Sequence, residues 1–147
     1  MTGLEGIPVR VEDQTAAGGL TDNVLPVLHE IRHALDRLVE DGEPTIVDLT
    51  AMPFGPGDEE RLLAALGSGE VAATIDTIGL THVRETSFPG VWLVDHLSAE
   101  GARLVLHVEV ATVPSLLATP AEDLAEARRR LDVRLADFGA GDDQPTQ

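Results

Sequence analysis

Apolar residues recur with a helical period in the first part of the chain and with a period of two in its middle. An apolar stripe that ends near Glu40, before Gly42 and Pro44, predicts a helix. Either Asp22 or Asn23 can cap its first turn. The stripe consists of Leu25, Leu28, Ile31, Leu35, Leu38 and Val39.

A short strand is predicted next, over residues 45–49, followed by a loop rich in proline and glycine over 52–57. A second helix starts with Asp58, whose carboxylate can cap the first turn, and it ends at Gly67. Its inward residues are Leu62, Leu63 and Leu66.

From Glu70 onward, alternation of apolar and polar residues predicts an antiparallel meander. Its strands span residues 71–77, 81–87, 91–97 and 104–111. A last helix over 121–138 is expected to turn Leu124, Leu131 and Leu135 inward. The predicted fold is therefore an α+β two-layer domain, in which about four antiparallel strands carry two or three helices on one face.

The domain organisation follows from where this periodicity begins and ends. We expect one domain over residues 22–138, because strands and helices form a single segregated set and 147 residues suit one domain. Residues 1–21 are aperiodic, apart from a short candidate edge strand at 7–11, and are predicted to be flexible. Residues 139–147 are predicted to form a disordered acidic tail.

The last hairpin of the meander places its residues on two faces of the sheet. If residues 100 and 101 centre the turn, Leu97 faces Leu104, Leu93 faces Val108 and Val91 faces Val110. These pairs give an apolar face toward the helices. The opposite face carries Trp92, Val94, His96, Val105, His107 and Glu109.

The opposite face holds the chain's one tryptophan, which makes it a candidate contact surface. A partly apolar face with tryptophan suits a protein-binding site or a dimer interface. Alternatively, a terminal segment or the closing helix covers it. Asp95 is the polar exception on the inward face, where a cross-strand pair with Arg84 would accommodate it.

The turn Phe88–Gly90, with Glu85 before it, is a second candidate contact element. Phe88 either stays exposed for a peptide partner or folds back onto the core. Gly55–Glu60 contains two glycines without the following Lys and Ser or Thr of a phosphate-binding loop, so helix capping explains it better.

Charge narrows the classes of partner. Twenty-six acidic residues against ten basic ones give a net charge of −16, which repels nucleic acid and anionic lipid surfaces. A basic protein surface is a plausible partner, and solubility alone is the other explanation for such charge. The core must be largely aliphatic, because aromatic residues make up only 3% of the chain.

The chain has no cysteine, which excludes disulfides, thiolate zinc sites and clusters bound by cysteine. No apolar run approaches the ~20 residues that cross a bilayer, and the N-terminus lacks a signal-peptide pattern. We therefore expect a cytoplasmic protein that does not act at a membrane.

His29 to His33 spell H-E-x-x-H on the first predicted helix, the pattern of zinc metalloproteases. Two imidazoles four residues apart can bind Zn²⁺ while Glu30 acts as general base. The third ligand is missing, because His82, His96 and His107 lie on predicted strands with no matching spacing. An exposed helix flank is the better interpretation of His29 and His33. No catalytic constellation and no cofactor site remain.

Four segments in one order are similar to a known family: Leu28–His33, Gly55–Leu62, Gly69–Ala72 and Glu85–Trp92. Together they resemble the repeated C-terminal domain of the HupH/HyaF family of NiFe-hydrogenase expression and formation proteins. The resemblance covers about residues 24–131. Because the family often carries this domain twice, a single copy suggests a homodimer or a minimal family member.

The resemblance implies an accessory protein or chaperone of NiFe-hydrogenase maturation and not an enzyme. Its expected partner is a hydrogenase subunit precursor, with the iron–sulfur small subunit favoured before it joins the large subunit or is exported by its twin-arginine signal. A self-associating module and a zinc-dependent hydrolase are the alternatives. The expected partner-binding residues are Phe88 and Trp92 as apolar anchors with Glu85, His96, His107 and Glu109 around them.

Overall fold

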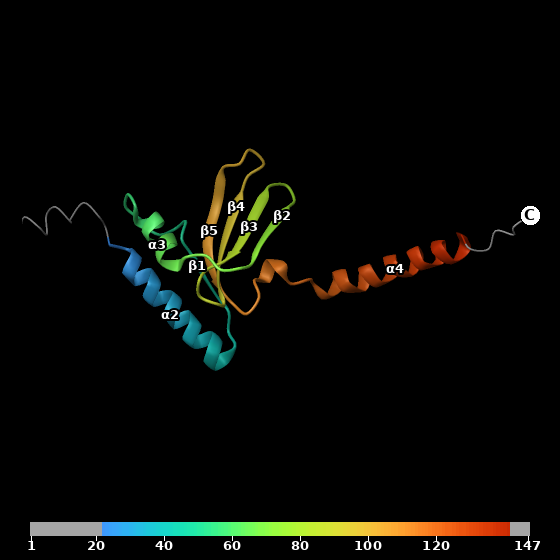
Figure 1. Ribbon diagram of the computed structural model, residues 1–147, viewed down its shortest axis with the longest axis horizontal. Helices are drawn as coiled ribbons and strands as arrows, with labels where there is room; N and C mark the ends of the chain where they lie inside the picture. Colours follow the sequence, from blue (N-terminus) through green and yellow to red (C-terminus); the bar gives the residue numbers. More distant parts are fainter. Residues whose placement is uncertain (1–21, 142–147) are drawn as a thin grey trace, which may run out of the picture. The chain divides into compact units, whose positions relative to one another are not determined.

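A computed structural model describes residues 22–141 of the chain (Figure 1). They divide into two compact units, one ending at Pro114 and one beginning at Ser115, so the predicted domain over 22–138 spans both. The segment over 1–21, including the candidate strand at 7–11, and the tail beyond residue 141 lie outside the described residues.

The first unit contains α2 (Val24–Asp41), β1 (Thr45–Asp48), α3 (Asp58–Leu66), β2 (Ala72–Asp76), β3 (Leu80–Glu85), β4 (Val91–Leu97) and β5 (Arg103–Val110). The second contains the 3₁₀ turn η1 (Ser115–Leu117) and α4 (Ala121–Gly141).

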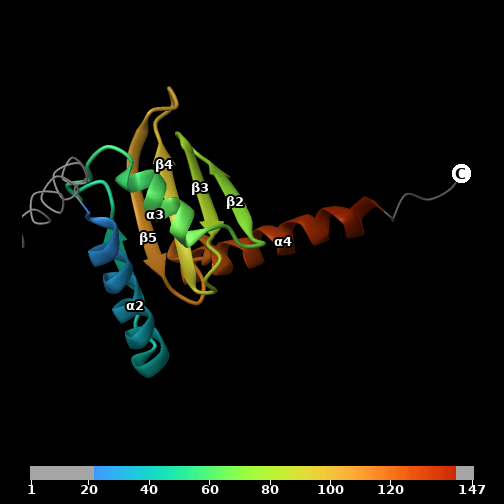
Figure 2. The same cartoon turned by 60° about the vertical axis from the view of Figure 1, so that its left-hand side comes forward.

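The first unit confirms the predicted α+β two-layer class. Its sheet has the order β1-β5-β4-β3-β2, and every neighbouring pair is antiparallel. Strands β2 to β5 form the predicted meander, and β1 adds a fifth strand at the edge beside β5. Helices α2 and α3 cover the same face of this sheet (Figures 1 and 2).

The core lies between that sheet face and the two helices. Its members alternate along the strands with outward residues and recur at helical spacing on α2 and α3. Removing them from water supplies most of the stabilisation, at about 25 cal/mol per Å² of apolar surface. The buried core consists of Val24, Val27, Ile31, Ala34, Val47, Leu49, Leu62, Leu66, Val91, Leu93, Leu106, Val108 and Val110.

The helix ends differ partly from the predicted capping. Gly42 ends α2 in the left-handed region (φ 70°) and donates its N–H to the Leu38 carbonyl, as its place in the sequence predicts. At the other end the side-chain amide of Asn23 donates to the Pro53 carbonyl (2.7 Å) and does not cap the helix. Asp58 is the first residue of α3, and its carboxylate accepts the N–H of Gly55 (3.0 Å), so it holds the preceding loop.

The β4–β5 hairpin follows the predicted register except beside its turn. Val91 faces Val110 and Leu93 faces Val108, as predicted. Leu97 faces Arg103, however, because a bulge after His96 shifts the register by one residue. The expected pair of Leu97 with Leu104 is therefore wrong, and Leu104 is exposed.

The same bulge changes the partner of Asp95. Arg103 reaches Asp95 with two parallel hydrogen bonds, from Nε to Oδ1 (3.0 Å) and from Nη2 to Oδ2 (3.1 Å). It also contacts Glu59 of α3. The predicted pair of Asp95 with Arg84 does not form, because Arg84 lies opposite Leu93 in the β3–β4 register.

Helix α4 runs over Ala121–Gly141, three residues beyond the predicted end. Leu124, Leu131 and Leu135 share one side of it, yet all three are exposed and the helix has no buried residue. No core for these leucines forms within the second unit, so their stripe is open on that unit taken by itself.

Candidate functional site

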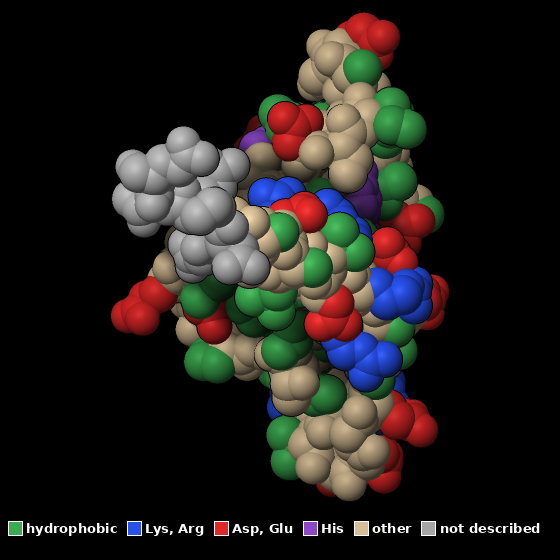
Figure 3. All heavy atoms as spheres, turned by 90° about the vertical axis from the view of Figure 1, so that its right-hand side faces the viewer, with side chains coloured by type: hydrophobic (Ala, Val, Ile, Leu, Met, Phe, Trp, Pro, Cys, Tyr) green, Lys and Arg blue, Asp and Glu red, His purple; other side chains and the backbone are tan. Residues whose placement is uncertain are grey.

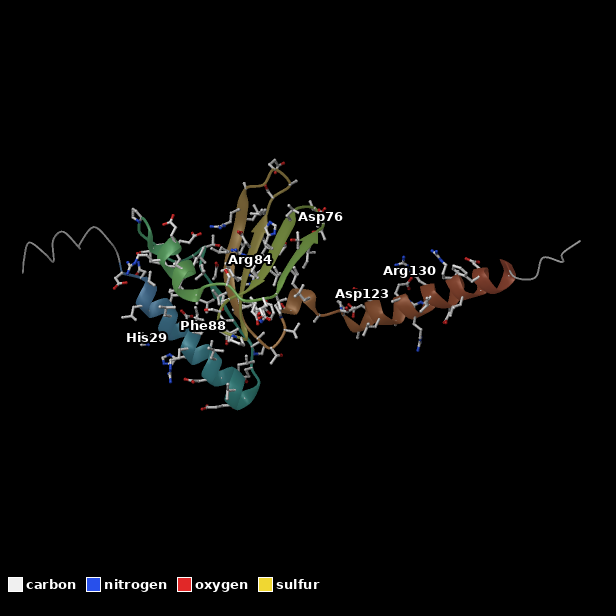
Figure 4. All side chains as sticks on the ribbon, viewed as in Figure 1. His29, Asp76, Arg84, Phe88, Asp123 and Arg130 are labelled. Atoms are coloured by element: carbon white, nitrogen blue, oxygen red, sulfur yellow. The ribbon has the colours of Figure 1, made fainter. Side chains whose placement is uncertain are left out.

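An apolar groove lies between α2 and the turn that follows β3. It has a volume of about 350 Å³ and is lined by Leu28, Ile31, Arg32, Leu35, Leu66 and Phe88. Five of these six side chains are apolar, and Phe88 keeps 48% of its surface exposed. The sequence left two alternatives for Phe88, exposure to a partner or packing back onto the core. The side chain combines them, because it forms one wall of the groove and about half of its surface remains exposed. Figure 4 shows it beside α2.

The turn that carries Phe88 is fixed from both sides. The Thr86 side-chain oxygen accepts the N–H of Phe88 (3.2 Å), and the Val91 N–H donates to the Phe88 carbonyl (3.0 Å). Ser87 donates both its N–H and its hydroxyl to the Leu66 carbonyl at the end of α3. Gly90 has φ 86°, a conformation that favours glycine. A partner would thus meet a groove that is already formed.

The first unit, which carries this groove, is strongly acidic as a whole. Arg32 at the edge of the groove is paired with Asp36 of the same helix (3.3 Å). Over residues 22–114 the sequence holds 16 acidic side chains against five arginines. Figure 3, which draws side chains of both units, shows carboxylates and arginines interspersed over one face. A basic segment is therefore attracted to this unit as a whole.

Trp92 lies on the face of the sheet opposite the helices, as predicted, but that face is not open around it. Trp92 is only 8% exposed, and its indole N–H donates to the Ala111 carbonyl (3.0 Å). It packs in a second apolar cluster with Val83, Val94, Ala73 and Ile75. The expected exposure of Trp92 is wrong, because the cluster and the segment after β5 enclose the ring.

The remaining polar residues of that face form a group around two imidazoles. The rings of His96 and His107 are 5.6 Å apart between centroids, and His96 Nδ1 lies 2.9 Å from the Thr81 hydroxyl. His107 Nε2 lies 3.9 Å from the carboxylate of Glu109, which is buried. The pKa of His107 is lowered, first by burial and then by His96, although Glu109 and Asp48 act in the opposite direction.

The lowered pKa of His107 predicts that the stability of the folded chain depends on pH. The unfolded chain takes up this proton near pH 6.5 while the folded chain resists it, so stability falls as the pH drops through that value. Wild type is expected to lose more stability between pH 7.5 and 5.5 than His107→Gln, as measured by urea unfolding midpoints. His29→Gln, at an exposed site on α2, is the control and should behave as wild type. Equal losses in wild type and His107→Gln would contradict this assignment.

The chain matches a family model over residues 21–137, described as the C-terminal conserved region of the HupH hydrogenase expression protein. The chain belongs to the HupH family. The match covers both α2 with its groove and most of α4, so both compact units are part of the HupH-family region.

Curated relatives of this HupH-family chain carry the same kind of name. It is 30% identical to the hydrogenase expression/formation protein HoxQ of Azotobacter vinelandii over 119 residues, which are 78% of this chain and 42% of that protein. It is 28% identical to the hydrogenase expression/formation protein HupH of Rhodobacter capsulatus over 120 residues, 80% of this chain and 44% of that one. The chain thus spans about two fifths of the length of the curated relatives it matches.

A solved structure supports the fold of the HupH-family chain. It is the hydrogenase expression protein HupH from Thiobacillus denitrificans ATCC 25259, with 46% sequence identity and a TM-score of 0.77. The likeness covers 80% of this chain and 98% of that chain.

The H-E-x-x-H segment of this HupH-family chain lies on α2. His29 and His33 are both exposed there. Within residues 22–141, no group of three or more His, Cys, Asp and Glu side chains could hold a metal ion. None of the described helices combines the length and hydropathy that a membrane crossing requires.

The structure separates the contact residues that the sequence grouped together. Phe88 lines the groove on the helix side, whereas Trp92, His96, His107 and Glu109 share the other face of the sheet. Glu85 ends β3 and lines another cavity, of about 230 Å³, together with Arg84, the residue labelled in Figure 4.

Sequence reasoning assigned Leu28, Leu35 and Leu66 to the core and missed the groove that they line. The groove arises from three segments that are distant in sequence, so no local pattern marks it. The structure leaves Leu28 and Leu35 only half buried beside the buried Ile31, and nothing in the sequence distinguishes these three positions.

Proposed function

We propose that this chain is a non-catalytic, cytoplasmic accessory protein of NiFe-hydrogenase maturation that binds a hydrogenase subunit precursor in the α2–Phe88 groove. The observation that carries the proposal is a preformed apolar groove, walled by a half-exposed Phe88, on a strongly acidic unit of a HupH-family chain. The names of its relatives, hydrogenase expression or formation proteins, support a role in making the enzyme.

The groove suits a segment that presents apolar side chains, such as one face of a helix. Leu28, Ile31 and Leu35 lie one helical turn apart along one wall, so a bound helix can place its own apolar residues between them. Phe88 closes the other wall. Truncation of an aromatic residue that acts as the central anchor of an interface costs about 2 kcal/mol or more in binding.

The iron–sulfur small-subunit precursor is the favoured client because of charge. A net charge of −16 attracts a precursor that carries a basic, arginine-containing export signal. Such attraction raises the rate of association more than the final affinity. The apolar groove then supplies the part of the binding energy that does not depend on salt.

The test is a titration of the purified chain with three labelled proteins, namely unprocessed small subunit, small subunit without its signal segment, and large subunit. The unprocessed precursor should bind most tightly, and its association rate should fall between 20 and 150 mM salt because charges are screened more at higher ionic strength. Absence of binding to all three would overturn the proposed function. Equal binding of both small-subunit forms, or an unchanged rate in salt, would remove the role of the signal.

A further inference from the structure

Strand β2 forms one edge of the sheet of the first unit (Figures 1 and 2). Among the described strands it pairs only with β3, in a continuous register from Ala72 with Arg84 to Asp76 with Leu80. Its other side therefore carries a row of backbone N–H and C=O groups that no described strand uses. A helix such as α4 bonds its own backbone internally, so only another strand can pair this row.

The hydrogen bonds of β2 define which residues point to the free edge. The N–H of Glu85 donates to the Val71 carbonyl (2.8 Å), so Val71 directs its carbonyl toward β3. Because backbone groups alternate in direction along a strand, Ala73 and Ile75 also bond with β3. The residues that direct both backbone groups to the free edge are therefore Ala72, Thr74 and Asp76.

Strand β2 lacks the features that commonly block pairing at an edge. It contains no proline, lysine or arginine, and its pairing with β3 has no bulge. A second copy of β2 fits this edge when it lies antiparallel with Thr74 on a two-fold axis. Thr74 then faces Thr74 of the second copy, and Ala72 faces Asp76. In this register every outward N–H and C=O group of the strand gains a partner.

The same register also pairs two unmatched charges. Asp76 and Arg84 are both exposed, and neither forms an ion pair with another described residue (Figure 4). Arg84 lies opposite Ala72, which in turn faces Asp76 of the second copy. The three residues share one face of the joined sheets and span two strand spacings, about 10 Å. The small side chain of Ala72 lets the guanidinium reach across it to the carboxylate.

On the opposite face the joined strands extend an apolar cluster. Ala73 and Ile75 already pack against the buried cluster that contains Trp92. In the proposed register Ala73 faces Ile75 of the second copy, and the exposed Val71 faces Thr77. The pairing therefore covers apolar surface on one face while it matches charges on the other.

We propose that two copies of this chain associate through their β2 strands and so join their sheets into one antiparallel sheet. One strand pair is small beside the roughly 1,600 Å² of a standard interface, so we expect a dissociation constant on the order of 10 μM. Strand β2 lies at the opposite edge of the sheet from β1, and α2 contacts β1 and β5. The dimer leaves both α2–Phe88 grooves open, and its failure would leave the proposed client site unaffected.

The test is sedimentation velocity of the full chain over about 1 to 300 μM. Salt at about 150 mM screens the net charge of −16 on each copy. Wild type should pass from monomer to dimer over this range. Thr74→Pro removes the N–H groups on the axis yet keeps the β2–β3 ladder, since that N–H points away from β3. Its dissociation constant should rise by about 30-fold or more. Thr74→Val keeps the N–H and is the matched control, which should dimerise as wild type does.

An exchange of charges tests the register itself. Asp76→Arg and Arg84→Asp each place like charges side by side in a homodimer and should weaken it by about tenfold. An equal mixture of the two variants restores opposite charges at both contacts, so a heterodimer of near wild-type affinity should form. Because both positions are exposed, these variants also cover the case in which Thr74→Pro does not fold.

Three outcomes would overturn the proposal. The first is a wild-type chain that remains monomeric at 300 μM. The second is a folded Thr74→Pro protein that dimerises as wild type does. The third is a mixture of Asp76→Arg and Arg84→Asp that associates no better than either variant alone.

Discussion

Replacement of Trp92 by Ala is expected to lower the free energy of unfolding of the chain by about 3 to 5 kcal/mol. That is the usual cost of removing a large aromatic ring from a well-packed site. Trp92 is 8% exposed, packs against Val83 and Val94, and donates its indole N–H to Ala111. Its loss leaves a cavity on the outer sheet face and an unpaired carbonyl after β5.

The measurement is urea unfolding followed by circular dichroism, since the variant has no tryptophan fluorescence. Phe138→Ala is the matched control, because that ring is 73% exposed on α4 and its loss should change the stability of the first unit by less than about 0.5 kcal/mol. A Trp92→Ala protein as stable as wild type would mean that the ring is not a packing residue. If that variant also bound the small-subunit precursor more weakly, the loss would reflect a direct contact between Trp92 and the precursor.

Phe88→Asp is expected to weaken binding of the small-subunit precursor by about 30-fold or more while leaving the fold intact. The change places a carboxylate at the wall of an apolar groove, where a client's apolar side chain would have to desolvate it. Phe88 is already half-exposed and the turn is held by backbone and Thr86 contacts, so stability should fall by less than about 1 kcal/mol.

Ile78→Asp is the matched control for this variant. Ile78 lies between β2 and β3, is exposed, and does not line the groove, yet the change adds the same charge. Titration of both variants with the precursor at one salt concentration gives the comparison. Equal losses in the two would assign the effect to net charge, and equal affinity of Phe88→Asp and wild type would exclude the groove as the client site.

The alternation of apolar and polar residues predicted the pairing of the strands correctly. It did not predict which faces of the sheet are covered by other side chains. Successive side chains on a strand point to opposite faces of the sheet, so the alternation of residues on β4 and β5 predicted two cross-strand pairs. These are Val91 with Val110 and Leu93 with Val108. The bulge after His96 left no mark on that alternation. Alternation placed Trp92 on the correct face, yet it could not show that the face is itself packed, as the fully buried Val83 and Val94 reveal.

Helix α4 illustrates the same limit. Leucines at helical spacing look alike whether their stripe packs inside the chain or against another molecule. Leu124, Leu131 and Leu135 were therefore assigned inward from spacing alone. Nothing in the sequence of α4 distinguishes these two cases, since both arginines and aspartates flank the stripe.

The pairing of β1 with β5 has a consequence for how the chain folds during synthesis. Thr45 lies opposite Val110, so the edge of the sheet closes across more than 60 residues of intervening chain. Helix α2 is made before any strand that it covers, and although β1 and α3 also contact it, its apolar side is fully covered only once β5 has left the ribosome. A nascent chain that ends short of residue 110 therefore leaves the side chains of Val27, Ile31 and Ala34 incompletely covered, which makes it a natural substrate for general chaperones.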